Sequence, residues 1–205
     1  MIGLENMDRA LYEGIGYFDI PELEAVDEFT AKNFGRLIYW NKEEQPKETC
    51  LHTFSYDYQF NSVWSNPDKW LPRLHRFDSV LAPDFSMYTD MPKALQIYNH
   101  FRKHWVARYW SENGIKVIPN IGWSTPDSYE WCFDGEPVNS VVAVSSVGCL
   151  KKPEAKKLFL QGFDAMMERL NPKQIILYGA VPDEIKKYDL IKIPHHYEAM
   201  KEKNK

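Results

Sequence analysis

Short apolar runs alternate with amphipathic helical segments along this chain, and this alternation constrains the fold more than any other feature of the sequence. Helical spacing is clearest over residues 92–113, which stop at Gly114, and over residues 153–170, which stop at Asn171. The β-favouring runs occupy residues 36–41, 49–56, 78–82, 115–123, 140–144, 174–178 and 190–193. Strands that alternate with helices at this spacing predict a parallel sheet with right-handed crossovers.

Seven candidate strands in 205 residues fit one α/β domain that spans residues 1–205. The first interpretation is a (β/α) barrel-like fold with a closed or partly closed parallel sheet, and the alternative is an open doubly wound sheet. Residues 1–35 are expected to lead into the domain, with a short helix over 21–34, and residues 201–205 to form a frayed tail. Shorter helical pieces are expected over residues 61–77, 129–133 and 182–188, the first of them divided by Pro67 and Pro72.

Composition excludes several classes of protein. The net charge of -4 argues against a general nucleic-acid binder, which must neutralise phosphates with Lys and Arg. The longest apolar stretch, residues 140–150, is interrupted by Ser145, Ser146 and Gly148, so no membrane helix is expected. The acidic amino terminus lacks the basic start of a signal peptide. A cytoplasmic protein is therefore expected.

Cysteine usage and aromatic content bear on cofactors and on the core. Cys50, Cys132 and Cys149 have none of the spacings that ligate metals, which argues against a structural zinc site and against an iron-sulfur cluster. Aromatic residues make up 15% of the chain. We expect most of them in the core rather than on a stacking surface.

Polar and aromatic residues follow the predicted strands at their carboxyl ends, where both candidate architectures bind ligands. Because these ends meet at one edge of a parallel sheet, their side chains should converge. They are Trp40, Asn41, Asp57, Tyr58, Asp84, Ser86, Asn120, Trp123, Ser145, Ser146, Tyr178 and His195.

Asp57, Asp84 and His195 are the catalytic candidates. The candidates for binding substrate are Tyr58, Ser86, Asp90, Asn120, Trp123, Ser145, Ser146 and Tyr178. Carboxylates at adjacent strand ends can divide acid and base roles or hold Mg²⁺ or Mn²⁺. The alternative is that each aspartate caps loop amides, as Asp84 could do for residues 85–88. His195 and His196 face opposite ways on an extended chain, and both could equally be surface residues.

Two further patterns have competing explanations. Residues 145–148 (SSVG), with Lys151 and Lys152 nearby, could bind an anion at a helix start or simply form a turn. The helix over residues 92–113 mixes basic and aromatic residues, as single-stranded nucleic-acid sites do, but ordinary solvated helix faces look alike. These residues are Lys93, His100, Arg102, Lys103, His104, Trp105, Arg108, Tyr109 and Trp110. No Walker, G-x-G-x-x-G, H-E-x-x-H, G-x-S-x-G or kinase motif is present.

Several motifs resemble a family of bacterial and phage proteins, the domain of unknown function 4417. The resemblance covers residues from about Asp19 to His195 and rests on 57–60 (DYQF), 64–68 (WSNPD), 83–86 (PDFS), 88–92 (YTDMP), 118–119 (IP), Trp123, 133–135 (FDG) and 178–179 (YG). It implies a protein of bacterial chromosomes, phages or mobile elements, and no particular activity. It gives weight to Asp57, Asp84 and Asp90. The family pattern has an acidic pair where this chain has Tyr56 and Asp57, which weakens the case for a two-carboxylate metal site at that strand.

Two functional hypotheses follow. The first is a phage or mobile-element enzyme whose polar site at the strand ends, assisted by Mg²⁺ or Mn²⁺, acts on a phosphorylated or nucleotide-like small molecule. The second is a non-catalytic protein that binds a host protein or single-stranded nucleic acid through aromatic and basic surfaces.

Overall fold

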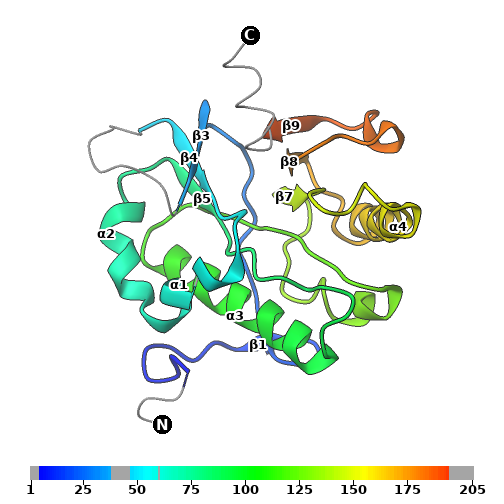
Figure 1. The fold of residues 1–205 in the computed structure, drawn as a ribbon. Coiled ribbons are helices and arrows are strands. Elements are labelled where there is room, and N and C mark those ends of the chain that lie inside the picture. The colour runs from blue at the N-terminus through cyan, green and yellow to red at the C-terminus, as the bar shows by residue number, and fades with distance from the viewer. Residues whose placement is uncertain (1–4, 38–46, 60, 194–205) are drawn as a thin grey trace.

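The computed structural model describes residues 5–37, 47–59 and 61–193, and its elements alternate between strands and helices (Figure 1). The strands are β1 (Gly14–Ile15), β2 (Ile20–Pro21), β3 (Asn33–Arg36), β4 (Thr49–His52), β5 (Ser79–Leu81), β6 (Val117–Ile118), β7 (Val141–Ser145), β8 (Gln174–Tyr178) and β9 (Leu190–Ile193). The α-helices are α1 (Asn61–Ser65), α2 (Leu71–Leu74), α3 (Lys93–Glu112) and α4 (Pro153–Leu170), and the 3-10 helices are η1 (Asp57–Gln59), η2 (Pro67–Trp70), η3 (Pro126–Glu130) and η4 (Asp183–Ile185). The α/β class with parallel sheets is confirmed.

From β3 to β9, strands that are neighbours within a sheet are also consecutive along the chain. β3, β4, β5 and β6 form one parallel sheet, and β7, β8 and β9 form another. An isolated parallel bridge between Asn120 and Ala143 joins the two sheets, with Ala143 donating to Pro119 O and Ile121 donating to Ala143 O, both at 2.8 Å. This sequential order lacks the reversal that defines a doubly wound sheet. Within the described ranges no pairing joins β3 to β9, so closure of a barrel is not demonstrated.

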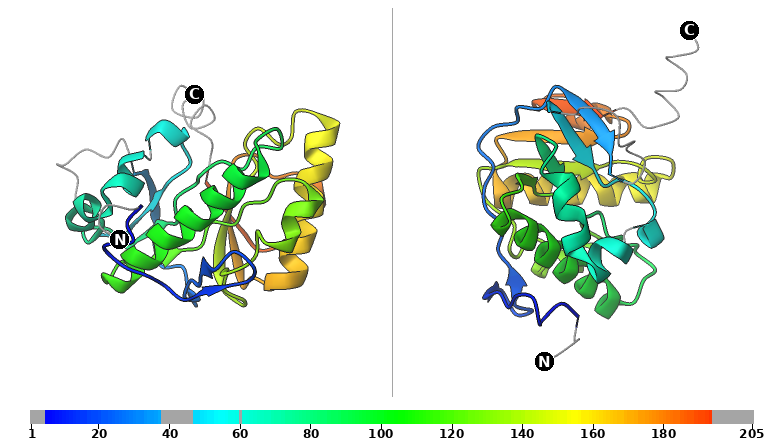
Figure 2. Two further views of the ribbon diagram at one scale, coloured as in Figure 1. Left: turned by 90° about the horizontal axis from the view of Figure 1, so that it is seen from below. Right: turned by 90° about the vertical axis from the view of Figure 1, so that its left-hand side faces the viewer.

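The helices match the sequence patterns closely. α3 and α4 lie within one residue of their predicted limits, and Asn171 ends α4 in the left-handed conformation at φ 44°. Pro67 and Pro72 divide the segment before β5 into η2 and α2, because neither proline can donate within a helix interior. The two long helices, green and yellow in Figure 2, flank the strands. No helix in the described residues is both long and apolar enough to cross a bilayer.

The buried side chains form three groups. One lies between the first sheet and helices α1 to α3 and contains Trp64, Trp105 and Trp110, and a second lies between α4, η3 and the second sheet. The third covers the opposite face of the strands and draws one or more residues from every strand from β4 to β9, including Cys50, Leu81, Ile118, Val141, Ile176 and Ile193. The expectation that the aromatic residues are mainly core residues is confirmed for these tryptophans.

The helix predicted over residues 21–34 is wrong. After β2 this segment is extended: Val26 exchanges hydrogen bonds with the start of β7, and Lys32 N donates to Glu48 O ahead of β4 at 2.8 Å. Val26 and Phe29 pack against the third group of buried residues. The segment therefore crosses the amino-terminal ends of the strands, and tertiary hydrogen bonds replace those that a helix would have formed.

Candidate functional site

A cavity of about 450 Å³ opens at the carboxyl ends of the strands, where the site was expected. That volume is within the range of small-molecule sites. Its polar and charged lining comprises Arg36, Ser55, Asp84, Ser86 and Ser145, and its aromatic lining comprises Phe54, Tyr56, Phe85, Tyr88, Trp123, Phe159 and Tyr178. Six of the seven parallel strands thus contribute to one surface, through their last residues or the segments that follow them.

The aromatic walls are held in place by packing. Phe54 and Tyr178 stack with ring centroids 4.6 Å apart and planes 3° apart, and the His52 ring contacts both. Burial and the charge of Arg36 lower the pKa of His52 to about 3, so the histidine is neutral at physiological pH. Trp123 contacts Phe159 and lies over Gly162 of α4, where an added Cβ would come within 2.1 Å of the indole Nε1.

Asp84 is the carboxyl group that lines the cavity. Its Oδ1 accepts a 2.9 Å hydrogen bond from the Asn120 side chain. The pKa of Asp84 is raised to about 6, mainly by burial. The charge of Asp57 acts in the same direction, while the hydrogen bond from Asn120 and the charge of Lys103 oppose it. A carboxyl group that titrates near neutral pH can donate or accept a proton.

Asp57 has a different environment. It begins η1 and accepts hydrogen bonds from Ser86 N at 3.1 Å and from Ser86 Oγ at 2.6 Å. From the other side, the side chain of Asn99 donates to Ser86 O at 2.6 Å. Asp57 is absent from the cavity lining and fastens the loop that follows Asp84, which is the capping role considered for it above.

The remaining predicted residues divide into two groups. Ser86, Trp123, Ser145 and Tyr178 line the cavity, and Asn120 lies directly behind Asp84. Outside the lining are Ser146, which is buried and donates to Ala180 O at 2.7 Å, Asp90, which is exposed, and Tyr58, which is 70% exposed and stacks on Tyr56. Trp40, Asn41, His195 and His196 lie outside the described residues. An anion site at residues 145–148 stays a prediction.

One polar face of α3 is buried, so the interpretation of its basic and aromatic residues as solvated or nucleic-acid-binding is wrong for His100, Lys103, His104, Trp105 and Trp110. Lys93 is exposed, and Arg102, Arg108 and Tyr109 are partly buried. Trp105 and Trp110 are at most 1% exposed. Gln96, Asn99, His100, Lys103 and His104 are also buried, and they repeat at helical spacing along one side of the helix. This spacing was visible in the sequence, but polar residues on one helix face normally meet water.

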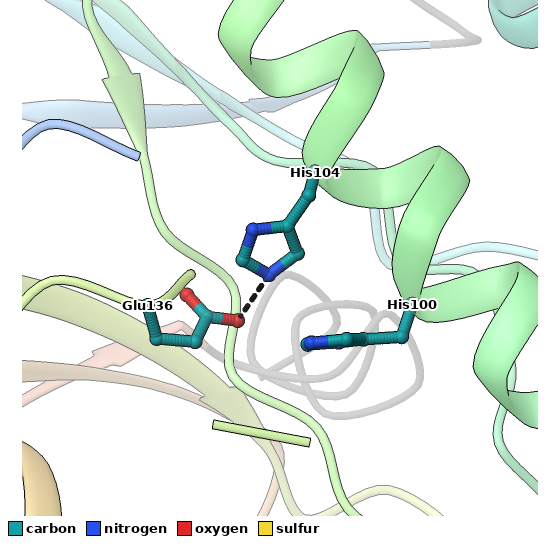
Figure 3. A group of neighbouring side chains, drawn as sticks. All are labelled: His100, His104 and Glu136. Carbon is teal, nitrogen blue, oxygen red and sulfur yellow. Dashed lines mark hydrogen bonds and ion pairs between the residues drawn. The ribbon is translucent and has the colours of Figure 1, made fainter. Parts of the chain in front are cut away.

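Glu136 balances the charge of this buried face. Its Oε1 accepts from Lys103 Nζ at 2.5 Å and lies 3.0 Å from His104 Nε2 (Figure 3). Burial alone would raise the pKa of Glu136, but the charges of Lys103 and His104 lower it. Lys103 Nζ also donates to Asn120 O at 2.9 Å, which connects this ion pair to the residue that holds Asp84.

The cysteines are free and lie apart. Cys50 packs in the third group of buried residues, Cys132 in the second, and Cys149 lines the cavity. Arg36, Ser55, Phe85 and Cys149 are cavity residues that the sequence analysis missed. Arg36 was predicted to begin a strand but ends β3, and Ser55 and Phe85 each lie one or two residues from a residue that was selected.

Comparison with known proteins places the chain in a family. The family model described as Domain of unknown function (DUF4417) matches residues 12–197. The chain belongs to this family. Most of the DUF4417 match therefore coincides with the described structure, and the resemblance noted from the sequence motifs is confirmed.

Two phage proteins are similar to this DUF4417 chain. The Gene 1 protein of Mycobacterium phage L5 is 36% identical over 176 residues, which are 83% of this chain and 75% of that protein. The Gene 1 protein of Mycobacterium phage D29 is 34% identical over 176 residues, with 83% of this chain and 64% of that protein covered. No solved structure matches the DUF4417 chain.

Proposed function

We propose that this chain is a phage or mobile-element enzyme that acts on a nucleotide-like small molecule in the strand-end cavity, with Asp84 as the group that transfers a proton. The observation that carries the proposal is the position of Asp84: a carboxyl group with a pKa of about 6 lines an aromatic-walled cavity of about 450 Å³. Ionisable groups whose pKa is shifted by burial and neighbouring charges are concentrated at functional sites.

The walls of the cavity favour a flat ligand. Trp123, Tyr56 and Tyr88 line the cavity with partly or largely exposed rings, and the buried rings of Phe54 and Tyr178 stack on each other in its wall. Stacking of a base on an aromatic side chain contributes about 1–3 kcal/mol. Arg36, Ser86 and Ser145 add a positive charge and hydroxyl groups, which suit a phosphate or a sugar.

The strand arrangement supports a partly closed (β/α) barrel as the framework for this site. Strands β3 to β9 follow one another in sequence order, and one or more residues from every strand from β4 to β9 enter a common apolar group. In barrels the inward residues pack in this way and catalytic groups stand at the carboxyl ends of the strands.

A divalent metal ion bound jointly by Asp57 and Asp84 is not part of the proposal. Ser86 donates both its amide and its hydroxyl group to Asp57. Asp57 is also absent from the lining of the cavity that Asp84 faces. Asp84 is therefore assigned the chemical role, and Asp57 the role of positioning the loop.

The test combines ligand screening with matched variants. A nucleotide present at 100 times its Kd should stabilise the protein by about 2.7 kcal/mol, or raise Tm by about 5–10 °C. Ribose 5-phosphate, which lacks a base, should have a much smaller effect. Trp123→Leu should lose this shift, whereas Asp84→Asn should retain it and lose turnover.

Asp90→Asn is the matched control, because Asp90 is an exposed carboxylate outside the cavity lining. It should bind and turn over ligand like the parent. If no nucleoside or nucleotide shifts Tm, or if Asp84→Asn keeps full turnover, the proposal is wrong.

A second candidate function rests on the rim of the cavity. Tyr56, Tyr58 and Tyr88 are 64–70% exposed there, although large apolar groups elsewhere are mostly buried. Exposed aromatic groups of this kind suit a host protein or single-stranded nucleic acid as partner. Replacing Tyr58, which lies outside the cavity lining, with serine should weaken binding to such a partner and leave nucleotide-induced stabilisation unchanged.

A further inference from the structure

A second cluster of chemistry-bearing side chains lies behind the cavity, between α3 and the turn that follows η3. His100 and His104 project from one face of α3, one helical turn apart, and Glu136 faces them (Figure 3). All three are buried, and one possible ligand atom from each lies within 4.8 Å of the other two. Two histidines and a carboxylate form a ligand set that is well known for zinc.

The backbone fixes which ring nitrogens are available. His104 Nδ1 lies 2.8 Å from Pro21 O, and His100 Nε2 lies 3.1 Å from Asp134 O. A carbonyl oxygen only accepts, so each of these nitrogens carries the proton and the opposite nitrogen, when the ring is neutral, carries a lone pair. Metal-binding histidines are held in this way, with the non-ligating nitrogen donating to a backbone carbonyl.

Gly135 allows this arrangement. It takes φ +74°, and an added Cβ would lie 2.5 Å from Pro21 O and 2.8 Å from His104 Nδ1. The turn can therefore bring Asp134 O and Glu136 to the two histidines only with glycine at this position.

The cluster has more acceptors than donors. His104 Nε2 faces Glu136 Oε1 at 3.0 Å, and a lone pair there would meet an ionised carboxylate. His100 Nδ1, Glu136 Oε2 and Asn120 Oδ1 are buried with no hydrogen-bond partner among the described residues. Buried acceptors without partners destabilise the folded protein. A cation would satisfy several of them at once.

We propose that His100, His104 and Glu136 bind a divalent transition-metal ion of the Zn²⁺ class. Ligand bonds of about 2.0–2.1 Å in a tetrahedral site place the ligand atoms about 3.4 Å apart. His104 Nε2 and Glu136 Oε1 are already 3.0 Å apart, and one ring nitrogen of His100 lies within 4.8 Å of a ligand atom of each. Small side-chain rotations complete the site, and no cysteine takes part in it.

Lys103 is the competing cation. Its ammonium group contacts Glu136 Oε1 and Asn120 O, so it neutralises the carboxylate that the ion would use. A metal ion would share Glu136 through the unpartnered Oε2 or displace Lys103 toward Asn120 and Asp84. The affinity of the site should therefore depend on the charge at residue 103.

The metal would lie next to the proposed catalytic carboxyl group without being part of it. A small cavity, with a volume of about 10 Å³, is lined by Asp84, His100, Lys103 and Asn120. It shares Asp84, Phe85, Met87 and Gly122 with the larger cavity. This space is about the size of one water molecule and reaches His100.

The first test is a titration of the metal-free full-length parent with Co²⁺ and Zn²⁺, with Mg²⁺ as the comparison ion. We expect one equivalent of Co²⁺ to bind and to give the intense visible absorption of a four-coordinate site, which Zn²⁺ should abolish by displacement. Mg²⁺, which prefers oxygen ligands, should not compete. Binding of substantially less than one equivalent, or Co²⁺ spectra typical of surface-bound octahedral ions, would overturn the proposal.

Variants identify the ligands. His104→Gln and Glu136→Gln should each weaken Co²⁺ binding at least about 100-fold, since loss of a mere supporting contact already costs 10–100-fold. His75→Gln, which changes an exposed histidine outside the cluster, is the matched control and should bind like the parent. If His104→Gln bound Co²⁺ as tightly as the parent does, the ion would bind elsewhere and the proposal would be wrong.

Lys103→Met separates a metal site from a purely structural ion pair. If the cluster binds metal, removing the competing ammonium group should raise the affinity about 10-fold or more, and the metal should stabilise the variant more than the parent. If the cluster is only an ion pair, the variant will be destabilised and Co²⁺ will not rescue it. No nucleotide is used in these measurements, so their outcome is separate from that of the proposed activity.

Discussion

The side-chain amide of Asn120 donates a 2.9 Å hydrogen bond to Asp84 Oδ1, while the backbone carbonyl of the same asparagine accepts from Lys103 Nζ. One residue therefore connects the cavity carboxyl group with the buried ion pair of α3. The first two predictions below depend on this relationship.

Asp84→Asn should stabilise the protein above pH 6. The pKa of Asp84 rises from 3.8 in the unfolded chain to about 6 in the folded protein, so between these values the folded state holds the proton more tightly. The stability that protonated Asp84 contributes is fully present below about pH 4 and is lost as the pH rises through 6. The free energy of unfolding then falls by up to about 3 kcal/mol. Urea unfolding at several pH values should show a gain for the variant at pH 7 that disappears at pH 4. Asp90→Asn, the exposed control, should change stability by less than about 0.5 kcal/mol.

Asn120→Ala should move the titration of Asp84 to higher pH. The hydrogen bond from Asn120 favours the ionised carboxylate and so lowers the pKa, whereas burial and the charge of Asp57 raise it. Without the hydrogen bond the pKa of Asp84 should rise above 6. The midpoint can be measured from the pH dependence of the stability difference between each protein and its Asp84→Asn counterpart. Asn61→Ala, which changes an exposed residue at the start of α1, is the control. A midpoint that stays in place in Asn120→Ala would show that the bond does not tune Asp84.

Gly162→Ala should damage the cavity wall. Alanine is normally the better helix residue by about 0.5–1 kcal/mol, but its Cβ would lie 2.1 Å from Trp123 Nε1. The steric clash should outweigh the gain in helix propensity, so the variant should lose about 1–3 kcal/mol of stability and its indole ring should be displaced. Denaturant unfolding and nucleotide binding together measure this effect. Gln161→Ala, on the exposed side of the same helix, should lose neither property.

Ser140→Ala should loosen the segment that crosses the amino-terminal ends of the strands. Ser140 Oγ accepts from Val26 N at 2.8 Å and is fully buried. Removing it leaves the amide of Val26 without this partner, at a cost of about 1–2 kcal/mol. Hydrogen exchange should accelerate at residues 22–32, whereas Ser65→Ala at the exposed end of α1 should leave exchange there unchanged.

The positions of the strands and of the two long helices could be predicted because their signals are local. Gly114 and Asn171 end the long helices, and the apolar run of β7 is typical of a strand buried on both faces. The general position of the site followed from the same elements, since parallel strands bring their carboxyl ends to one edge. Asp84, Ser86, Trp123, Ser145 and Tyr178 could therefore be chosen from the sequence.

The sequence by itself determined the order of the strands from β4 onward, the limits of the two long helices and the edge at which polar residues gather. It placed the first parallel strand at residues 36–41, whereas β3 spans Asn33–Arg36. Only the tertiary structure decided that residues 22–32 run extended, because their hydrogen-bond partners, such as Ser140, are more than 100 positions away. It also decided that the polar face of α3 is buried: Glu136 and backbone carbonyls from distant segments replace the water that would otherwise solvate Lys103 and the histidines. Such compensation depends on which groups meet in space, and no spacing along one helix can reveal it.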